Sequence, residues 1–188
     1  MTVTLWVDAT PSGPALLLRP WRESDLDALI EAHDDAAIRH WLRRPVRDQA
    51  DAARWLEAES RGWRDGQRLG FAVCEDPTGT GGDRPVAHVV LNRAVPDREF
   101  AQVGYWTAAR ARGRGVAARA VEALTGWVFD SFAGEGLNRL DLLHQVDNLA
   151  SCRVAEKAGY AFDRVLPARP PFPLDGHLHV RWADARAR

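Results

Sequence analysis

The chain has little cysteine, no excess of either charge and no long apolar run, and each absence excludes a class of protein. Its two cysteines, Cys74 and Cys152, lie far apart with no metal-ligand spacing, which argues against a disulfide framework or a zinc site. The 25 basic and 26 acidic residues give a net charge of -1, whereas a nucleic-acid scaffold would carry a basic excess. No apolar run reaches membrane-spanning length, and the N-terminus lacks the basic and apolar regions of a secretory signal. We therefore expect a cytoplasmic protein with neither nucleic-acid nor membrane partners.

The composition and the order of the apolar patterns indicate one α/β domain over residues 1–188. Apolar residues make up 46% of the chain and charged residues 27%, which is ordinary for a globular domain. Helical periodicity predicts helices over 24–34, 48–61, the segment after Gly115 and 148–157. Extended runs predict strands over 16–18, 69–75, 86–92, 99–107, 140–146, 160–165 and 178–182. Helices and strands that alternate in this way are typical of a mixed α/β protein.

The segment from Arg110 to Gly115, which reads Arg-Ala-Arg-Gly-Arg-Gly, is the most informative feature of the chain. It lies between a predicted strand and a predicted helix, so unpaired backbone N–H groups at the helix N-terminus are free to face an anion. The arginines add positive charge, and the glycines let a bulky phosphate approach the backbone closely. We therefore interpret the turn as an anion site for the pyrophosphate of a nucleotide-bearing cofactor.

Two common phosphate-binding motifs do not explain this turn. The residues from Gly113 to Ala118 fit Gly-x-Gly-x-x-Ala, the dinucleotide fingerprint, but that signal is weak when it stands alone. The ribose-binding acid expected about 20 residues later would fall in the loop at Glu135 and not at a strand end. A P-loop is excluded because no Gly-Lys-Ser/Thr follows the glycines.

Four short motifs in order along the chain resemble the GNAT family of acyl-CoA-dependent N-acetyltransferases. They are Gly104-Tyr-Trp106, Arg110-x-x-Gly113-x-Gly115, Asn148-Leu-Ala-Ser151 and Val154-x-x-Lys157-x-Gly159-Tyr160. The resemblance runs from about Leu16 to Trp182 and is greatest to the branch of ribosomal-protein serine/alanine N-terminal acetyltransferases, the RimJ/RimL type. Each motif is modest alone, and their order makes the family assignment specific.

The resemblance implies a GNAT fold, an α/β architecture with a mixed, mostly antiparallel sheet of about seven strands flanked by helices. The strands at 99–107 and 139–146 would splay apart, with the pantetheine of acetyl-CoA lying between them like an added strand. Main chain at Trp106 and Thr107 would bond the pantetheine amides, and N–H groups of the turn would hold the pyrophosphate. The implied cofactor-binding residues are Trp106, Thr107, Arg110, Arg112, Gly113, Arg114, Gly115, Val116, Ala117, Asn148 and Ser151.

The residues for proton transfer depart from the family pattern. Many members place a tyrosine seven residues after the asparagine to assist the leaving thiolate, and this chain has Ala155 there. The resemblance assigns that role to Ser151, whose O–H can stabilise or protonate a thiolate. Asn148 has two interpretations, as the N-cap of the helix that follows and as a contact to the pantetheine arm.

The general base is less well defined. The branch often carries a glutamate two residues before the Gly-Tyr-Trp motif, where this chain has Gln102, which cannot accept a proton. Glu99 is the first choice for a replacement, although a regular strand would point it to the opposite face. Other candidates are Asp97, Asp141 and His144, and deprotonation through water alone is a further alternative.

Cysteine and histidine near the C-terminus raise two other hypotheses. Cys152 beside a helix N-terminus would suit an acyl-cysteine intermediate, but a buried structural thiol is the commoner case. His177 and His179 share a strand face, yet without a third ligand in view we interpret them as strand-surface histidines and predict no metal.

The expected function is transfer of an acetyl group from acetyl-CoA to a primary amine, directly in a ternary complex. A protein or peptide N-terminal α-amine is the first choice of acceptor, because its pKa of about 7.7–8.0 lies well below the lysine value of about 10.4. The alternatives are a small-molecule amine, such as an antibiotic or polyamine, and a non-catalytic acyl-CoA-binding module. Since this branch is often dimeric, a homodimer is also expected.

Overall fold

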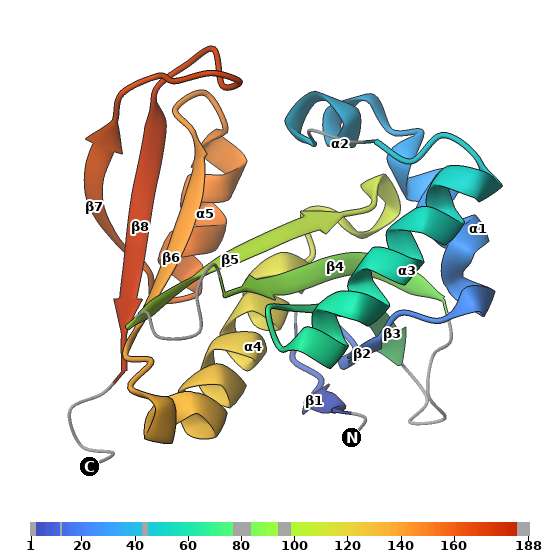
Figure 1. Ribbon diagram of the computed structural model, residues 1–188, viewed down its shortest axis with the longest axis horizontal. Helices are drawn as coiled ribbons and strands as arrows, with labels where there is room; N and C mark the ends of the chain where they lie inside the picture. Colours follow the sequence, from blue (N-terminus) through green and yellow to red (C-terminus); the bar gives the residue numbers. More distant parts are fainter. Residues whose placement is uncertain (1–2, 12, 43–44, 77–83, 94–98, 184–188) are drawn as a thin grey trace.

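One mixed sheet organises the computed structural model, which describes residues 3–11, 13–42, 45–76, 84–93 and 99–183. Within these residues eight strands form the sheet in the order β1-β2-β3-β4-β5-β6-β8-β7 (Figure 1). The strands are β1 Leu5–Val7, β2 Ala15–Pro20, β3 Arg68–Asp76, β4 Pro85–Asn92, β5 Phe100–Thr107, β6 Arg139–Gln145, β7 Ala161–Leu166 and β8 Gly176–Trp182. Every neighbouring pair is antiparallel except β5 and β6, which are parallel.

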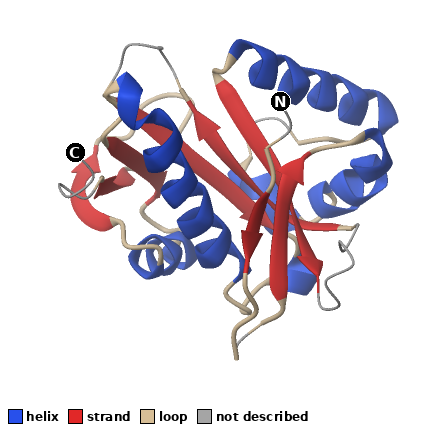
Figure 2. Ribbon diagram, turned by 90° about the horizontal axis from the view of Figure 1, so that it is seen from below, coloured by secondary structure: helices blue, strands red, loops and turns tan. Residues whose placement is uncertain are grey.

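Helices cover both faces of this sheet (Figure 2). They are α1 Leu26–His33, α2 Ala36–Trp41, α3 Gln49–Asp65, α4 Val116–Phe132 and α5 Leu149–Lys157. Short 3-10 turns occur at Glu23–Asp25, Ala109–Ala111 and Ala133–Glu135. In the part of the chain that the structure describes, every helix is too short or too polar to cross a membrane.

The predicted α/β fold is confirmed, and the structure adds two short elements to it. The strand β1 pairs with β2 at the edge of the sheet, which makes eight strands where about seven were expected. The helix α2 begins at an N-cap, Asp35, whose carboxylate accepts a hydrogen bond from the Ile38 amide at 3.0 Å. Neither element is long enough to show a clear periodicity in the sequence. The helix α3 extends beyond the predicted end because its C-cap is Gly66, in the left-handed region at φ 65°.

Two apolar clusters lie on opposite faces of the sheet. One packs α4 and α5 on the sheet and includes Val121, Leu124 and Leu142, all at most 1% exposed. The other lies under α1–α3 and is rich in tryptophan, with Trp21 and Trp106 in ring contact at a centroid distance of 5.8 Å. Trp106 is therefore held in the core by its side chain, and its main chain belongs to β5.

The parallel strands β5 and β6 pair over half of their length and then diverge. Paired positions run from Phe100 opposite Arg139 to Val103 opposite Leu142. Beyond Val103, β5 remains paired with β4 alone, so its other edge is without a strand partner from Gly104 to Thr107. The strands β6–β8 with α5 swing away from β1–β5 at this point (Figure 1). The expected splay between these two strands is confirmed.

Candidate active site

A cleft of about 490 Å³ lies where β5 and β6 diverge. Four segments from distant parts of the sequence form its walls: α2, the end of β5, the glycine-rich turn with the start of α4, and α5. The lining residues are Ala37, Ile38, Trp41, Leu42, Tyr105, Trp106, Thr107, Ala111, Arg112, Gly113, Gly115, Val116, Ala117, Ala118, Asn148, Ala150, Ser151, Arg153, Val154 and Lys157. Of the residues predicted to bind the cofactor, all except Arg110 and Arg114 line this cleft.

The glycine-rich turn presents unpaired backbone N–H groups to the cleft. Gly113 and Gly115 have φ values of 76° and 75°, a conformation that other residues rarely adopt. Gly115 is the N-cap of α4, and the first hydrogen bond of the helix runs from the Arg119 amide to the Gly115 carbonyl at 3.1 Å. The three amides before Arg119 thus precede the helical ladder and have no partner within it. A Cβ at Gly113 would meet no atom within 4 Å, so the space in front of the turn is open.

The three arginines of the turn differ in where they point. Arg112 lines the cleft, where its Nε donates to the Thr107 carbonyl at 3.1 Å and its Nη2 donates to Asp35 at 2.6 Å. The hydrogen bond from Arg112 is the main cause that lowers the pKa of Asp35. This ion pair ties the N-terminus of α2 to the turn, so Arg112 both adds charge to the cleft and positions the helix above it.

Arg110 and Arg114 face away from the cleft into ion pairs with other elements. Arg110 pairs with Glu31 of α1 at 3.0 Å and donates to the Pro85 carbonyl at 2.7 Å. Arg114 pairs with Glu75 of β3 at 2.8 Å. Their side chains therefore support the turn from outside. Among the described residues, the cations that line the cleft are Arg112, Arg153 and Lys157.

The N-terminus of α5 carries the next predicted residues. Asn148 is the N-cap of this helix, and its Oδ1 accepts a hydrogen bond from the Ser151 amide at 3.2 Å, which confirms the capping interpretation. Ser151 is 8% exposed and faces β5. Asn148 and Ser151 both line the cleft, on the wall formed by the N-terminus of α5.

A tyrosine that the sequence analysis did not select contacts Ser151. The Tyr105 hydroxyl donates a hydrogen bond to the Ser151 Oγ at 2.8 Å. Burial is the largest cause that raises the pKa of Tyr105 to about 12, so the phenol holds its proton at neutral pH. Because Ser151 accepts this bond, its own proton is left for another acceptor in the cleft. The signal was present in the Gly104-Tyr-Trp106 motif, but only the main chain of that strand was assigned a role.

Two of the acidic candidates for a general base, Glu99 and Asp141, lie outside the cleft. Glu99 is exposed just before β5, where its carbonyl accepts from the Asn138 and Arg139 amides, and its side chain does not line the cleft. Asp141 is buried and bound to Arg139 at 2.6 Å. Asp97 lies outside the described residues. Among the described residues that form the cleft, none is an aspartate, glutamate or histidine.

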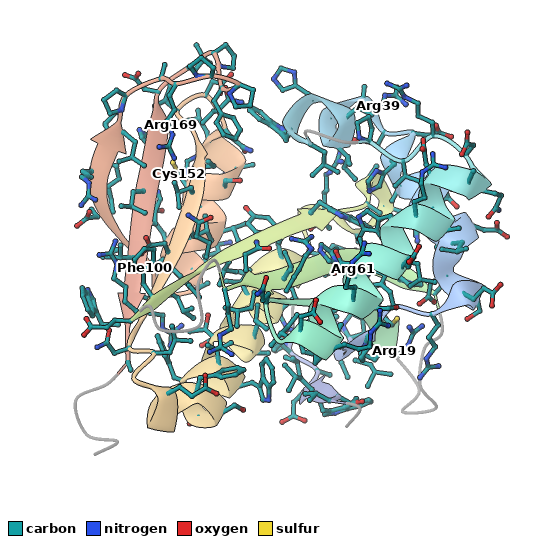
Figure 3. The ribbon with its side chains drawn as sticks, in the orientation of Figure 1. Arg19, Arg39, Arg61, Phe100, Cys152 and Arg169 are labelled. Atoms are coloured by element: carbon teal, nitrogen blue, oxygen red, sulfur yellow. The ribbon has the colours of Figure 1, made fainter. Side chains whose placement is uncertain are left out.

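Histidines predicted to lie on a strand surface are gathered with the cysteine under α5. His179 is only 2% exposed, so the expectation of a surface residue is wrong for it. Two further residues join His177 and His179 in this group: Cys152 and His144, the latter also a candidate for the general base. Cys152 is half-buried and lies on the side of α5 that faces β6 and β8 (Figure 3). These four residues are up to 35 positions apart in the sequence, so no short motif indicates that they lie close together in the structure.

Comparisons with known proteins identify the family of this chain as the GNAT acetyltransferases. The family described as an acetyltransferase (GNAT) domain matches residues 15–161. Among solved structures, a RimL ribosomal L7/L12 α-N-protein acetyltransferase in complex with coenzyme A is similar, with 20% identity and a TM-score of 0.79 over 93% of this chain and 98% of that chain. A search of curated proteins finds no match.

Two further solved structures share the fold. RimJ from Mycobacterium smegmatis, in complex with a CoA disulfide, is 20% identical with a TM-score of 0.77, over 100% of this chain and 89% of that chain. The microcin C7 self-immunity acetyltransferase MccE, in complex with acetyl-CoA and AMP, is 18% identical with a TM-score of 0.75, over 93% of this chain and 98% of that chain. One fold thus serves both a ribosomal-protein and a microcin acetyltransferase.

Proposed function

Since the chain belongs to the GNAT acetyltransferase family and is an acyl-CoA-dependent N-acetyltransferase, we propose that its acceptor is the N-terminal α-amine of a protein or peptide. The acetyl group moves directly from acetyl-CoA to the amine in a ternary complex. The single domain over residues 1–188, the cytoplasmic location and a homodimer are parts of the same proposal.

The geometry of the turn suits the cofactor of this family. In the proposal, the amides from Gly113 to Ala117 hold the pyrophosphate, and Arg112 adds a charged contact. The unpaired edge of β5 at Trp106 and Thr107 bonds the pantetheine amides. Supporting this, the Thr107 Oγ1 is buried without a hydrogen-bond partner among the described residues, as expected where a ligand supplies one. Asn148 contacts the pantetheine arm through its side-chain NH2 group, since its Oδ1 already accepts a hydrogen bond from the Ser151 amide.

Assistance to the leaving thiolate falls to Ser151 and Tyr105. Attack by the amine on the thioester carbonyl breaks the carbon–sulfur bond and leaves a thiolate on coenzyme A. In the proposal the Ser151 O–H donates to that sulfur, and Tyr105 holds Ser151 in the donating orientation through their 2.8 Å hydrogen bond. A buried hydroxyl pair can do this because burial keeps the Tyr105 phenol protonated.

The acceptor class rests on one observation, the lack of any carboxylate or histidine among the described residues that line the cleft. A lysine side chain, with a pKa of about 10.4, needs a base to become nucleophilic at neutral pH. An α-amine, with a pKa of about 7.7–8.0, is neutral in a substantial fraction of molecules without one. A cleft without a base therefore favours an α-amine, deprotonated through water. Glu99 stays a prediction for the base, with no contact in the cleft to support it.

Paired peptides test the acceptor. Each peptide begins with serine or alanine, contains one internal lysine, and is made with a free or a blocked N-terminus. Release of free thiol from acetyl-CoA and mass spectrometry of the product should show acetylation of the free α-amine alone. The rate should rise between about pH 6.5 and 8 as the α-amine loses its proton.

Other outcomes of the same assay identify the alternatives. Faster turnover on lysine side chains or on small amines such as polyamines would contradict the α-amine proposal and favour a small-molecule or side-chain acceptor. Coenzyme A binding by calorimetry with no turnover on any amine would favour a non-catalytic acyl-CoA-binding module. The Ser151→Ala variant distinguishes slow chemistry from a contaminating activity, because a contaminant would not respond to it.

A further inference from the structure

Three histidines and a cysteine lie together under α5, away from the residues that line the cleft. His144 of β6 is directly opposite His177 of β8, and His179 lies two residues further along β8. Residues at these positions point to one face of the sheet, and α5 covers that face with Cys152. One ligand atom from each of the four residues lies within 4.8 Å of the other three. We call His144, Cys152, His177 and His179 the Cys–His cluster.

The spacing inside the Cys–His cluster is close to that of a tetrahedral metal site. The Cys152 Sγ lies 3.5 Å from the His144 Nε2 and 3.4 Å from the His177 Nδ1. In a zinc site with bonds of about 2.0–2.1 Å to nitrogen and 2.3 Å to sulfur, neighbouring ligand atoms are roughly 3.3–3.7 Å apart. The rings of His144 and His179 stack at a centroid distance of 5.2 Å. The other pairs of ligand atoms are at most 4.8 Å apart, so they must approach by no more than roughly 1.5 Å to reach this spacing.

An unpartnered buried histidine points to a missing ligand here. His179 is 2% exposed, and the Tyr160 backbone lies near its ring, yet neither ring nitrogen completes a hydrogen bond within the described residues. Leaving a buried polar group unpaired is costly, and native proteins avoid it. The ring contacts of His179 leave both nitrogens without a partner, and a metal ion would use one of them.

The surroundings of His144 prepare it as a ligand. Its Nδ1 lies 2.8 Å from the Gln145 carbonyl, which fixes the proton on Nδ1 and leaves the lone pair on Nε2, the atom that faces Cys152. A backbone carbonyl that orients a ligating histidine in this way is the usual arrangement in zinc proteins.

We propose that the Cys–His cluster binds one zinc ion in a closed, four-coordinate site. Three imidazoles and one thiolate complete the tetrahedron, and the Cys152 proton is released to solvent when the metal binds. With no open position, the ion serves structure: it fastens the start of α5 to β6 and β8. Since Ser151 precedes Cys152 on the same helix, the zinc also holds the wall of the cleft on which Ser151 lies.

Cobalt provides the first test, because it occupies zinc sites and has visible spectra. Metal-free protein is titrated with Co²⁺ and then with Zn²⁺. We expect one Co²⁺ per chain, with the absorption of a tetrahedral ion and a thiolate-to-cobalt charge-transfer band, all displaced by one equivalent of Zn²⁺. Cys152→Ala should lose the charge-transfer band, and His177→Gln should weaken Co²⁺ binding by at least about tenfold.

Matched controls keep the test decisive. Cys74→Ala removes the other cysteine and His40→Gln an exposed histidine of α2, and both should bind cobalt as the wild type does. Circular dichroism of each metal-free variant shows whether it folds. A charge-transfer band that survives Cys152→Ala, or folded wild-type protein without stoichiometric cobalt binding, would overturn the proposal.

Thermal unfolding gives a second, independent readout that needs no acetyltransferase activity. Zinc at a hundredfold excess over its Kd should raise the Tm of the wild type by roughly 5–10 °C. The folded His177→Gln and Cys152→Ala variants should show less than half of this rise. An equal rise in wild type and variants would mean that zinc binds elsewhere and would also overturn the proposal. These outcomes do not depend on which amine the protein acetylates.

Discussion

The two ends of the cleft are built from different parts of the polypeptide. At the turn, the proposed binding groups are main-chain amides that follow one another from Gly113 into α4. At the other end, the proposed reactive groups are two hydroxyls, those of Tyr105 in β5 and Ser151 in α5, which lie 46 residues apart in sequence. The geometry of the first end is set by a local backbone conformation, whereas that of the second depends on two side chains that the splayed sheet brings together.

The difference teaches which changes each end tolerates. Apart from proline, no substitution removes a backbone N–H, so the amides of the turn depend on the sequence mainly through the two glycines that set their geometry. The hydroxyl pair depends on each side chain, and it also depends on how α5 packs against β6. We therefore expect changes at the turn to affect cofactor binding and changes at the hydroxyls to affect turnover.

The largest effect is expected from Gly113→Asp combined with Gly115→Asp. The two residues would need positive φ values, and their carboxylates would repel the pyrophosphate. Coenzyme A affinity by calorimetry should fall by at least about a hundredfold, or about 2.7 kcal/mol. Gly136→Asp is the matched control, since Gly136 has a φ of 80° and open space but lies away from the cleft. Retained affinity in the double variant would refute the anion site.

The next effect is expected from Ser151→Ala at the other end. Loss of the hydroxyl removes the donor to the leaving thiolate, so kcat should fall by about a hundredfold. The Kd for coenzyme A should change by less than about threefold, because the amides of the turn are unaffected. Ser60→Ala, an exposed position on α3, serves as the control. If Ser151→Ala weakened coenzyme A binding and left kcat unchanged, Ser151 would be a binding residue and the division between the two ends would fail.

A smaller effect separates the arginines of the turn. Arg112→Ala removes a partly exposed charge from the cleft and should weaken coenzyme A binding by about 1–2 kcal/mol. Arg114→Ala removes a neighbouring charge that pairs with Glu75 outside the cleft, and the affinity should change little. Equal losses in both variants, measured by calorimetry at the same ionic strength, would indicate a general charge effect and not a contact.

The smallest effect on turnover is expected from Tyr105→Phe, because Ser151 keeps its hydroxyl. We expect kcat to fall by about three- to tenfold, a loss of about 1 kcal/mol typical of one hydrogen bond. Stopped-flow or steady-state thiol release measures it. No loss in kcat would show that Ser151 needs no support from the phenol.

A pH titration tests whether Tyr105, the partner of Ser151, is buried and protonated. Tyr105 and Tyr160 are the two tyrosines of the chain, and the pKa of each is raised to about 12, chiefly by burial. Ultraviolet absorbance of the folded protein should show phenolate forming near pH 12, against about pH 10 in denaturant. The neutral phenols stabilise the fold below pH 10, and that contribution is lost as pH rises from 10 through 12. Titration near pH 10 in the folded state would show that Tyr105 is exposed.

Most of the secondary structure and the conformation of the glycine-rich turn could be predicted from the sequence. The strands β3 to β6 lie within one or two residues of their expected bounds, and α4 begins directly after Gly115 as expected. Two shorter elements were not predicted: α2 has six residues and β1 has three, too few to show a periodic pattern of apolar residues. The turn was predictable because glycine and the start of a helix dictate its hydrogen bonds within a few residues.

The tertiary structure alone decided the side-chain partners. The contact of Tyr105 with Ser151 depends on where β5 and β6 part, and that of Arg112 with Asp35 on the packing of α2 over the cleft. The Cys–His cluster depends on the register of β6 against β8. Sequence determined what the backbone does locally, because dihedral angles and hydrogen bonds within a turn involve near neighbours. Which side chains meet across the sheet follows from packing between distant segments, and no short pattern of residues contains that information.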